Sequence, residues 1–138
     1  MSKITVWFIR CAMIYFVLAL LLGLHMSVAG PVYPSRPVHV HFNLLGWMSM
    51  MIYGVAYHIL PRFSGRALWS DTLATAHIWL ANIGLVGMAA GWMIRTAGGG
   101  TAVLFIFSLL EGVSIFFFVL NMFLTIKPAP PPKKAAAH

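Results

Sequence analysis

Four long apolar runs constrain this chain more than any other feature of its sequence. They cover roughly residues 4–28, 38–60, 73–94 and 101–126, and each is long enough for the about 20 residues that a helix needs to cross a bilayer. Of the 138 residues, 61% are hydrophobic and only 8% are charged, a balance outside the range of soluble globular domains. We therefore predict an all-α membrane protein with four transmembrane helices, embedded in the lipid bilayer.

The breaks between the runs are short and contain several glycines and prolines, among them Pro34, Pro61 and Gly65. Short connections make consecutive helices antiparallel neighbours, so we expect one four-helix domain over residues 1–126. The first run is too long for a signal peptide and lacks a small-residue cleavage site, so we expect it to be retained. Residues 127–138 are rich in proline and lysine, which predicts a disordered tail.

The net charge of +7 follows the pattern expected for the loops of a membrane protein. We therefore attribute it to membrane topology and expect no nucleic-acid partner. Cytoplasmic loops of membrane proteins carry an excess of lysine and arginine. One side of the predicted bundle holds both termini and the second loop; the other holds the first and third loops. The first side has Lys3, Arg62, Arg66, Lys127, Lys133 and Lys134, and the second has Arg36 and Arg95. We expect a multi-pass protein of a bacterial-type inner membrane with both termini in the cytoplasm.

Two histidines, His39 and His41, stand near the outer end of the second run. Successive helical residues rotate by about 100°, so these two side chains lie roughly 200° apart and face different pockets. Imidazole is costly to bury alone at membrane depth, and neutral imidazole is a common ligand of heme iron. The spacing therefore suggests heme ligation; the alternative is an interfacial pair satisfied by water and lipid headgroups.

The residues that follow this pair extend the pattern without a gap as far as Gly65: they are Phe42, Gly54, His58, Pro61, Phe63, Ser64 and Gly65. This stretch resembles the tenth helix of the catalytic subunit of heme-copper oxidases and nitric oxide reductases. In that family the first histidine of the pair ligates the high-spin heme and the second ligates the low-spin heme. The resemblance implies that His39 and His41 each face a heme iron.

The chain also departs from that family. A full catalytic subunit has about twelve helices and binds copper through further histidines, including an adjacent His-His pair. This chain has four apolar runs and no His-His. We therefore expect no copper site and no reduction of oxygen.

The resemblance also suggests an assembly. The family's catalytic subunit resembles three successive four-helix arcs around a pseudo-threefold axis, and this chain resembles one arc. Three copies would rebuild the ring, and each cleft between copies would receive one His39 and one His41. We expect a homo-oligomer, preferably a homotrimer, because closed cyclic symmetry makes such clefts without a second kind of subunit.

Three further polar residues are candidates for the site. His25 is expected at the outer end of the first helix, where it could ligate iron or bind a heme propionate. Arg36 is expected two residues before the second helix, where its guanidinium suits a carboxylate; the alternative is an interfacial arginine that snorkels. Glu111 is expected near mid-bilayer, which favours either proton handling or a buried hydrogen bond.

Two other histidines are expected to be structural. His58 lies about 28 Å from His39 by the helical rise, so the two cannot share an iron. His77 is expected at the cytoplasmic interface, where it opens the third helix.

Together these features predict a b-type membrane cytochrome that carries single electrons on a bis-histidine heme b, with a quinol or another redox protein as partner. One alternative is a gas-binding or gas-sensing heme protein, or a small nitric oxide reductase, with an open coordination site. Another is a non-catalytic accessory subunit that keeps the oxidase-like helix for packing.

Overall fold

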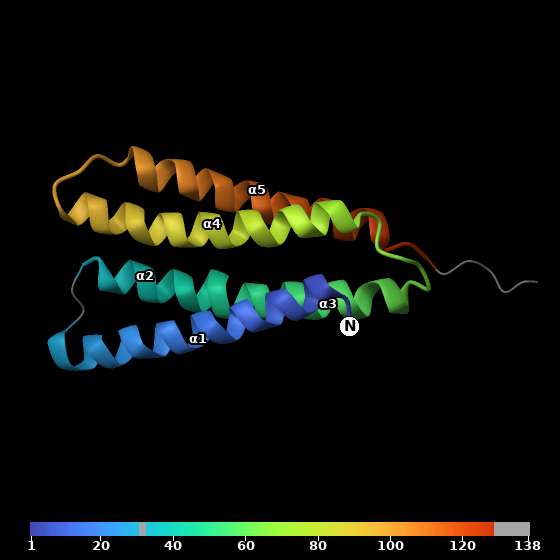
Figure 1. Cartoon of the computed structure of the whole chain (residues 1–138), viewed down its shortest axis with the longest axis horizontal. Helices are drawn as coiled ribbons and strands as arrows, with labels where there is room; N and C mark the ends of the chain where they lie inside the picture. The colour runs from blue at the N-terminus through green and yellow to red at the C-terminus, as the bar shows by residue number, and fades with distance from the viewer. Residues whose placement is uncertain (31–32, 129–138) are drawn as a thin grey trace, which may run out of the picture.

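Four long helices run antiparallel in the computed structural model, which describes residues 1–30 and 33–128 (Figure 1). The first span is α1 (Lys3–Ala29), and the third and fourth are α4 (Asp71–Thr96) and α5 (Ala102–Thr125). The second span is one continuous helix of three parts: α2 (Ser35–His41), the π-helix η1 (Phe42–Ser49) and α3 (Met50–Phe63). All four spans are long and apolar enough to cross a membrane, which confirms the predicted all-α membrane fold.

The boundaries of the second span differ from the expectation. It begins at Ser35, so Arg36 lies inside its first turn and not before it, and it continues through Pro61 to Phe63. The helix was expected to end before Pro61, but it continues past this residue. Amides that follow Pro61 bond back to the last turn: Ser64 donates to the carbonyl of Leu60, and Arg66 donates to that of Pro61. The chain leaves the helix at Gly65, whose φ of 60° favours glycine.

The connection between α3 and α4 is fastened to the end of α5. The amide of Ser70 donates to Asn121 Oδ1 at 3.1 Å, and Asn121 Nδ2 donates back to the carbonyl of Ser70 at 2.8 Å. The amide of Trp69 donates to Thr125 Oγ1 at 3.0 Å. Ser70 also caps α4, because its Oγ accepts the amide of Leu73. These bonds satisfy polar groups that would otherwise be costly in the membrane.

Two helical hairpins make up the bundle, one of α1 with the second span and one of α4 with α5 (Figure 1). Small residues on α4 let α5 approach closely. A Cβ added to Gly91 would lie 2.7 Å from the Cα of Leu104, and one added to Gly87 would overlap the ring of Phe107. Close backbone approach at small residues is the usual basis of helix association in membranes.

The two ends of the bundle differ in charge. The α1–α2 and α4–α5 connections lie at one end, and the N-terminus and the α3–α4 connection lie at the other (Figure 1). Within the described residues, the N-terminal end carries Lys3, Arg62, Arg66 and Lys127, and the opposite end carries Arg36 and Arg95. Lys133, Lys134 and most of the predicted tail lie outside the described residues. The direction of the bundle across the membrane stays a prediction.

The glycine contact between α4 and α5 gives a stability prediction. Gly91→Ala should lower the free energy of unfolding by about 1–3 kcal/mol, because the backbone of Leu104 cannot turn away as a flexible side chain could. The measurement is the thermal midpoint of helix loss in detergent. Gly112→Ala is the matched control, since no atom lies within 4 Å of its added Cβ. Equal midpoints for the two variants would contradict the packing described.

Candidate functional site

His39 lies between the second span and α1. Its Nδ1 bonds to the carbonyl of Ala19 at 2.8 Å, and its Cε1 is 3.0 Å from the position of a Cβ added to Gly23. Asn43 Nδ2 lies 3.3 Å from its Nε2 and 3.1 Å from its carbonyl oxygen. A larger residue at position 23 would therefore displace the imidazole, so the absence of a side chain on α1 makes room for the ring.

His41 faces the other way, toward α4. Its ring centroid is 4.5 Å from that of Trp92, with an angle of 49° between the ring planes. Its Nδ1 bonds to the carbonyl of Pro37, one turn earlier, at 2.8 Å. At this end of the bundle the second span lies between α1 and α4 (Figure 1), so the two imidazoles point to opposite sides of it, as the helical geometry predicted.

The two rings share one hydrogen-bonding pattern. A main-chain carbonyl can only accept, so Nδ1 must carry the proton in both His39 and His41. In a neutral imidazole this leaves the lone pair on Nε2. A backbone carbonyl that orients a histidine through its second nitrogen is the usual outer-shell partner of a metal-binding histidine. Nε2 is therefore the nitrogen that each ring can offer to iron.

The π-helix η1 begins directly after His41. Asn43, in its first turn, contacts His39, and Gly46 packs against Tyr15 of α1, where an added Cβ would lie 2.6 Å from the tyrosine side chain. π-helical turns are rare and are frequent at functional sites. Nothing in the apolar sequence of this segment predicted it.

These side chains fit heme ligation in part. Both rings are half-buried, lie at the same end of the bundle and have Nε2 as the ligand nitrogen. They point in opposite directions, however, so a single chain does not bring them to one iron. Binding of iron at His39 also requires the Asn43 amide to turn away from Nε2.

The structure places the other two candidates at this same end. His25 is exposed and lies two residues after Gly23, within α1, which continues to Ala29 and does not end at His25. Arg36 is exposed in the first turn of α2. Among the described residues, neither side chain forms a hydrogen bond to the His39 or His41 ring.

Glu111 lies in α5 with 3% of its surface exposed. Its Oε2 would lie 2.7 Å from a Cβ added to Gly84 of α4, and the same oxygen has no hydrogen-bond partner among the described residues. It lies near the middle of α5 along the chain, and its mid-bilayer position stays a prediction. A buried carboxyl of this kind is costly unless it is neutral or partnered.

His77 differs from its expected place. It is fully buried, so its assignment to the interface was wrong. Its Nδ1 is 3.0 Å from the hydroxyl of Tyr57, and rings from the other spans surround it, with centroids 4.7–5.7 Å away for Phe8, Tyr53 and Phe118. Its Nε2 has no hydrogen-bond partner among the described residues.

No pattern in the sequence indicated this burial, because only the packing of all four spans encloses the His77 ring. His58, by contrast, contacts Arg62 one turn later at the opposite end from His39, and its structural role stays a prediction.

Comparison with known proteins supports the oxidase resemblance. The chain is 42% identical over 57 residues to cytochrome c oxidase subunit 1 of Rhodobacter capsulatus, a match that covers 41% of this chain and 11% of the relative. It is 41% identical over 63 residues to the Cbb3-type cytochrome c oxidase subunit CcoN1 of Stutzerimonas stutzeri, which covers 44% of this chain and 13% of the relative. Part of this chain is similar to the catalytic subunit of heme-copper oxidases.

A third relative, the cytochrome c oxidase subunit 1 homolog of Agrobacterium tumefaciens, is 43% identical over 53 residues, or 38% of this chain and 10% of the relative. The chain therefore spans only about a tenth of the length of these oxidase subunits. No protein-family model matches the chain, and no solved structure matches it significantly.

The bond between Tyr57 and His77 gives a second prediction. Tyr57→Phe should lower the free energy of unfolding by about 1–3 kcal/mol, because it leaves a buried ring nitrogen without its partner. The measurement is again the thermal midpoint in detergent. Tyr53→Phe is the control, since Tyr53 contacts the same ring edge-on without a hydrogen bond to it. A larger effect of the control would rule out the bond as the cause.

Proposed function

We propose that the chain is a membrane heme b protein, related to one third of a heme-copper oxidase catalytic subunit, that transfers single electrons. The observation that carries the proposal is that His39 and His41 lie near one level, face opposite sides of one span, and donate Nδ1–H to main-chain carbonyls. The similarity to oxidase subunits gives independent support.

Each heme is proposed to lie between copies of the chain. Because His39 and His41 point apart, two axial histidines on one iron require His39 from one copy and His41 from the next. In a homotrimer every cleft between copies would receive one His39 and one His41. Three copies also match the three four-helix arcs of a full catalytic subunit. His25 and Arg36, at the same end, are proposed to bind the heme propionates.

Electron transfer is favoured over gas chemistry in this arrangement. Two axial histidines leave the iron no open position, so the heme supplies reversible one-electron chemistry. The carbonyls of Ala19 and Pro37 hold the rings of His39 and His41 in orientation and make Nε2 a stronger donor. A quinol or another redox protein is the proposed partner, and no copper is proposed.

The proposed setting is a bacterial-type inner membrane with both termini in the cytoplasm. The support is the excess of lysine and arginine at the N-terminal end of the bundle. His39 and His41 then lie toward the outer face.

The first functional prediction concerns heme retention. His39→Ala and His41→Ala should each abolish the Soret band of the purified protein, because each leaves every cleft with one axial ligand fewer. His58→Ala is the control, since His58 lies at the other end of the second span and should keep full heme content. Wild-type protein without a Soret band would overturn the proposal and favour the accessory-subunit alternative.

A mixing experiment tests whether the heme is shared. His39→Ala and His41→Ala chains are co-expressed in equal amounts. A cleft then has both ligands only where the chain that supplies His39 carries the His41→Ala change and the chain that supplies His41 carries the His39→Ala change. Random mixing in a closed ring should then restore roughly a quarter of the wild-type heme content. No restoration would contradict a heme shared between copies of the chain.

Carbon monoxide separates electron transfer from gas binding. The reduced Soret band should stay unchanged on addition of carbon monoxide if both axial positions are filled. A prompt shift would favour the gas-binding alternative.

Glu111 is proposed to hold a proton at mid-membrane. Its buried carboxyl faces Gly84 without a partner for Oε2, a setting in which the neutral form is cheaper than the charged one. The infrared C=O stretch of a protonated carboxyl should appear at neutral pH and vanish in Glu111→Gln. Asp71→Asn is the control, because Asp71 is the other of the two acidic side chains and is exposed. Absence of the band in wild type would mean that Glu111 is ionised.

A further inference from the structure

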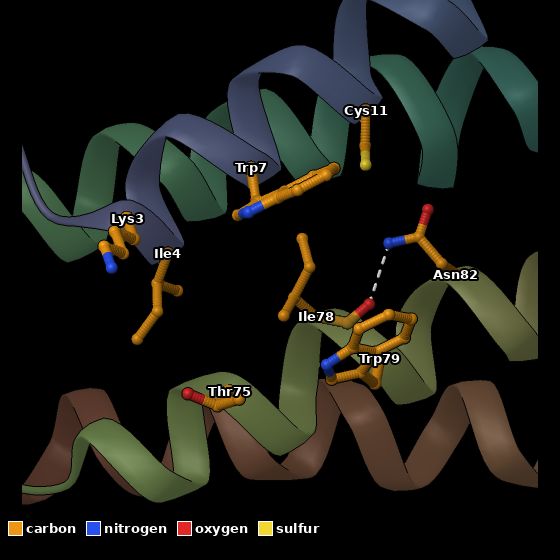
Figure 2. Close-up of a pocket in the computed structure, with 8 residues that line it drawn as sticks. All are labelled: Lys3, Ile4, Trp7, Cys11, Thr75, Ile78, Trp79 and Asn82. Carbon is orange, nitrogen blue, oxygen red and sulfur yellow. Dashed lines mark hydrogen bonds between the residues drawn. The ribbon is translucent and has the colours of Figure 1, made fainter.

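A cavity of about 480 Å³ opens between α1 and α4 in the half of the bundle that holds the N-terminus (Figure 2). It exists because α1 packs mainly on the second span and α4 mainly on α5, which leaves these two helices apart. The lining comes from both helices: Lys3, Ile4, Trp7 and Cys11 of α1, and Thr75, Ile78, Trp79 and Asn82 of α4. None of the candidate heme residues contributes to it.

The polar side chains of α4 that line the cavity already have hydrogen-bond partners. Asn82 Nδ2 donates to the carbonyl of Ile78 at 2.8 Å (Figure 2), and Asn82 Oδ1 accepts the hydroxyl of Tyr15 at 3.1 Å. Thr75 Oγ1 donates to the carbonyl of Asp71 at 2.8 Å. What remains is a largely apolar surface formed with Ile78, which suits a hydrocarbon chain.

The outer part of the cavity is different in character. Lys3 is the first residue of α1, and the exposed Trp7 follows it one turn later, whereas the exposed Trp79 of α4 lies farther in, at the level of Cys11 (Figure 2). An ammonium and an indole N–H group can donate hydrogen bonds but cannot accept them. This part therefore favours a ligand that brings acceptor oxygens and negative charge.

The charge of the surrounding residues also favours a negatively charged ligand. This end of the bundle also carries Arg62, Arg66 and Lys127, against one acidic side chain, Asp71. Along α1, the distance from Lys3 to Cys11 is about 12 Å by the helical rise. The cavity thus changes from cationic to apolar along the direction of the helices, which is also the direction in which lipids lie in a bilayer.

We propose that this cavity binds one anionic phospholipid, with its phosphate at Lys3, its glycerol region beside the indole of Trp7, and one acyl chain extending toward Trp79 and Cys11. Such lipids are enriched in the cytoplasmic leaflet of membranes. The proposal does not depend on heme binding by His39 and His41.

Brominated lipids provide a direct test, because bromine quenches tryptophan fluorescence only on contact. The full-length protein in nonionic detergent is titrated with phosphatidylglycerol or phosphatidylcholine, each brominated on its acyl chains. We expect half-maximal quenching at a concentration about fivefold lower for phosphatidylglycerol, since one lysine contributes on that scale to binding of anionic lipid.

Variants assign the effect to the cavity. Lys3→Gln should remove the preference for phosphatidylglycerol, whereas Arg66→Gln, which removes one charge from the same end outside the cavity, should keep it. The double variant Trp7→Phe and Trp79→Phe should lose the part of the fluorescence that phosphatidylglycerol quenches. Unchanged circular dichroism shows that each variant is folded.

Three results would overturn the proposal. Equal quenching by the two lipids would show that the cavity does not select a negative headgroup. If Lys3→Gln and Arg66→Gln reduced the preference for phosphatidylglycerol equally, the lipid would be attracted by the overall charge of this end and not by a site. Displacement of the brominated lipid by a short-chain quinone at a lower concentration than by unlabelled phosphatidylglycerol would identify a quinone site.

Discussion

The requirement that polar groups find partners inside the membrane governs the arrangement of this chain. At His39 and His41 it is met by Nδ1–H bonds to main-chain carbonyls, which fix both the direction of each ring and the position of its proton. A histidine on a lipid-facing surface could rotate freely, but these two cannot. The proposed heme site depends on that fixed orientation, since both rings must present Nε2 on opposite sides of one span.

Much of the fold could be predicted because apolar length alone identifies a spanning helix. The details that failed depend on contacts between spans. Pro61 remains inside its helix because the following amides bond back to Leu60 and Pro61. The π-helix after His41 packs Gly46 against Tyr15, and no pattern within the segment distinguishes it from an α-helix.

The candidate site also has features that the sequence predicts and features that depend on contacts between spans. The opposed directions of His39 and His41 follow from the rotation per residue of any helix, so the sequence was enough. The burial of His77 could not be predicted from the sequence, because the rings that enclose it, those of Phe8, Tyr57 and Phe118, belong to three other spans. The proposed pairing of His39 and His41 would be a property of an assembly, so it could be predicted neither from the helical pattern nor from the packing of one chain.

The side chain of Asn43 has a consequence for how the protein matures. Its amide lies within hydrogen-bonding distance of His39 Nε2, the same nitrogen that is proposed to bind iron. In the proposed heme-bound state, iron would take the place of the Asn43 amide at this nitrogen. Heme delivery would then follow folding and membrane insertion as a separate step, because the chain already supplies a partner for His39 on this side of the span.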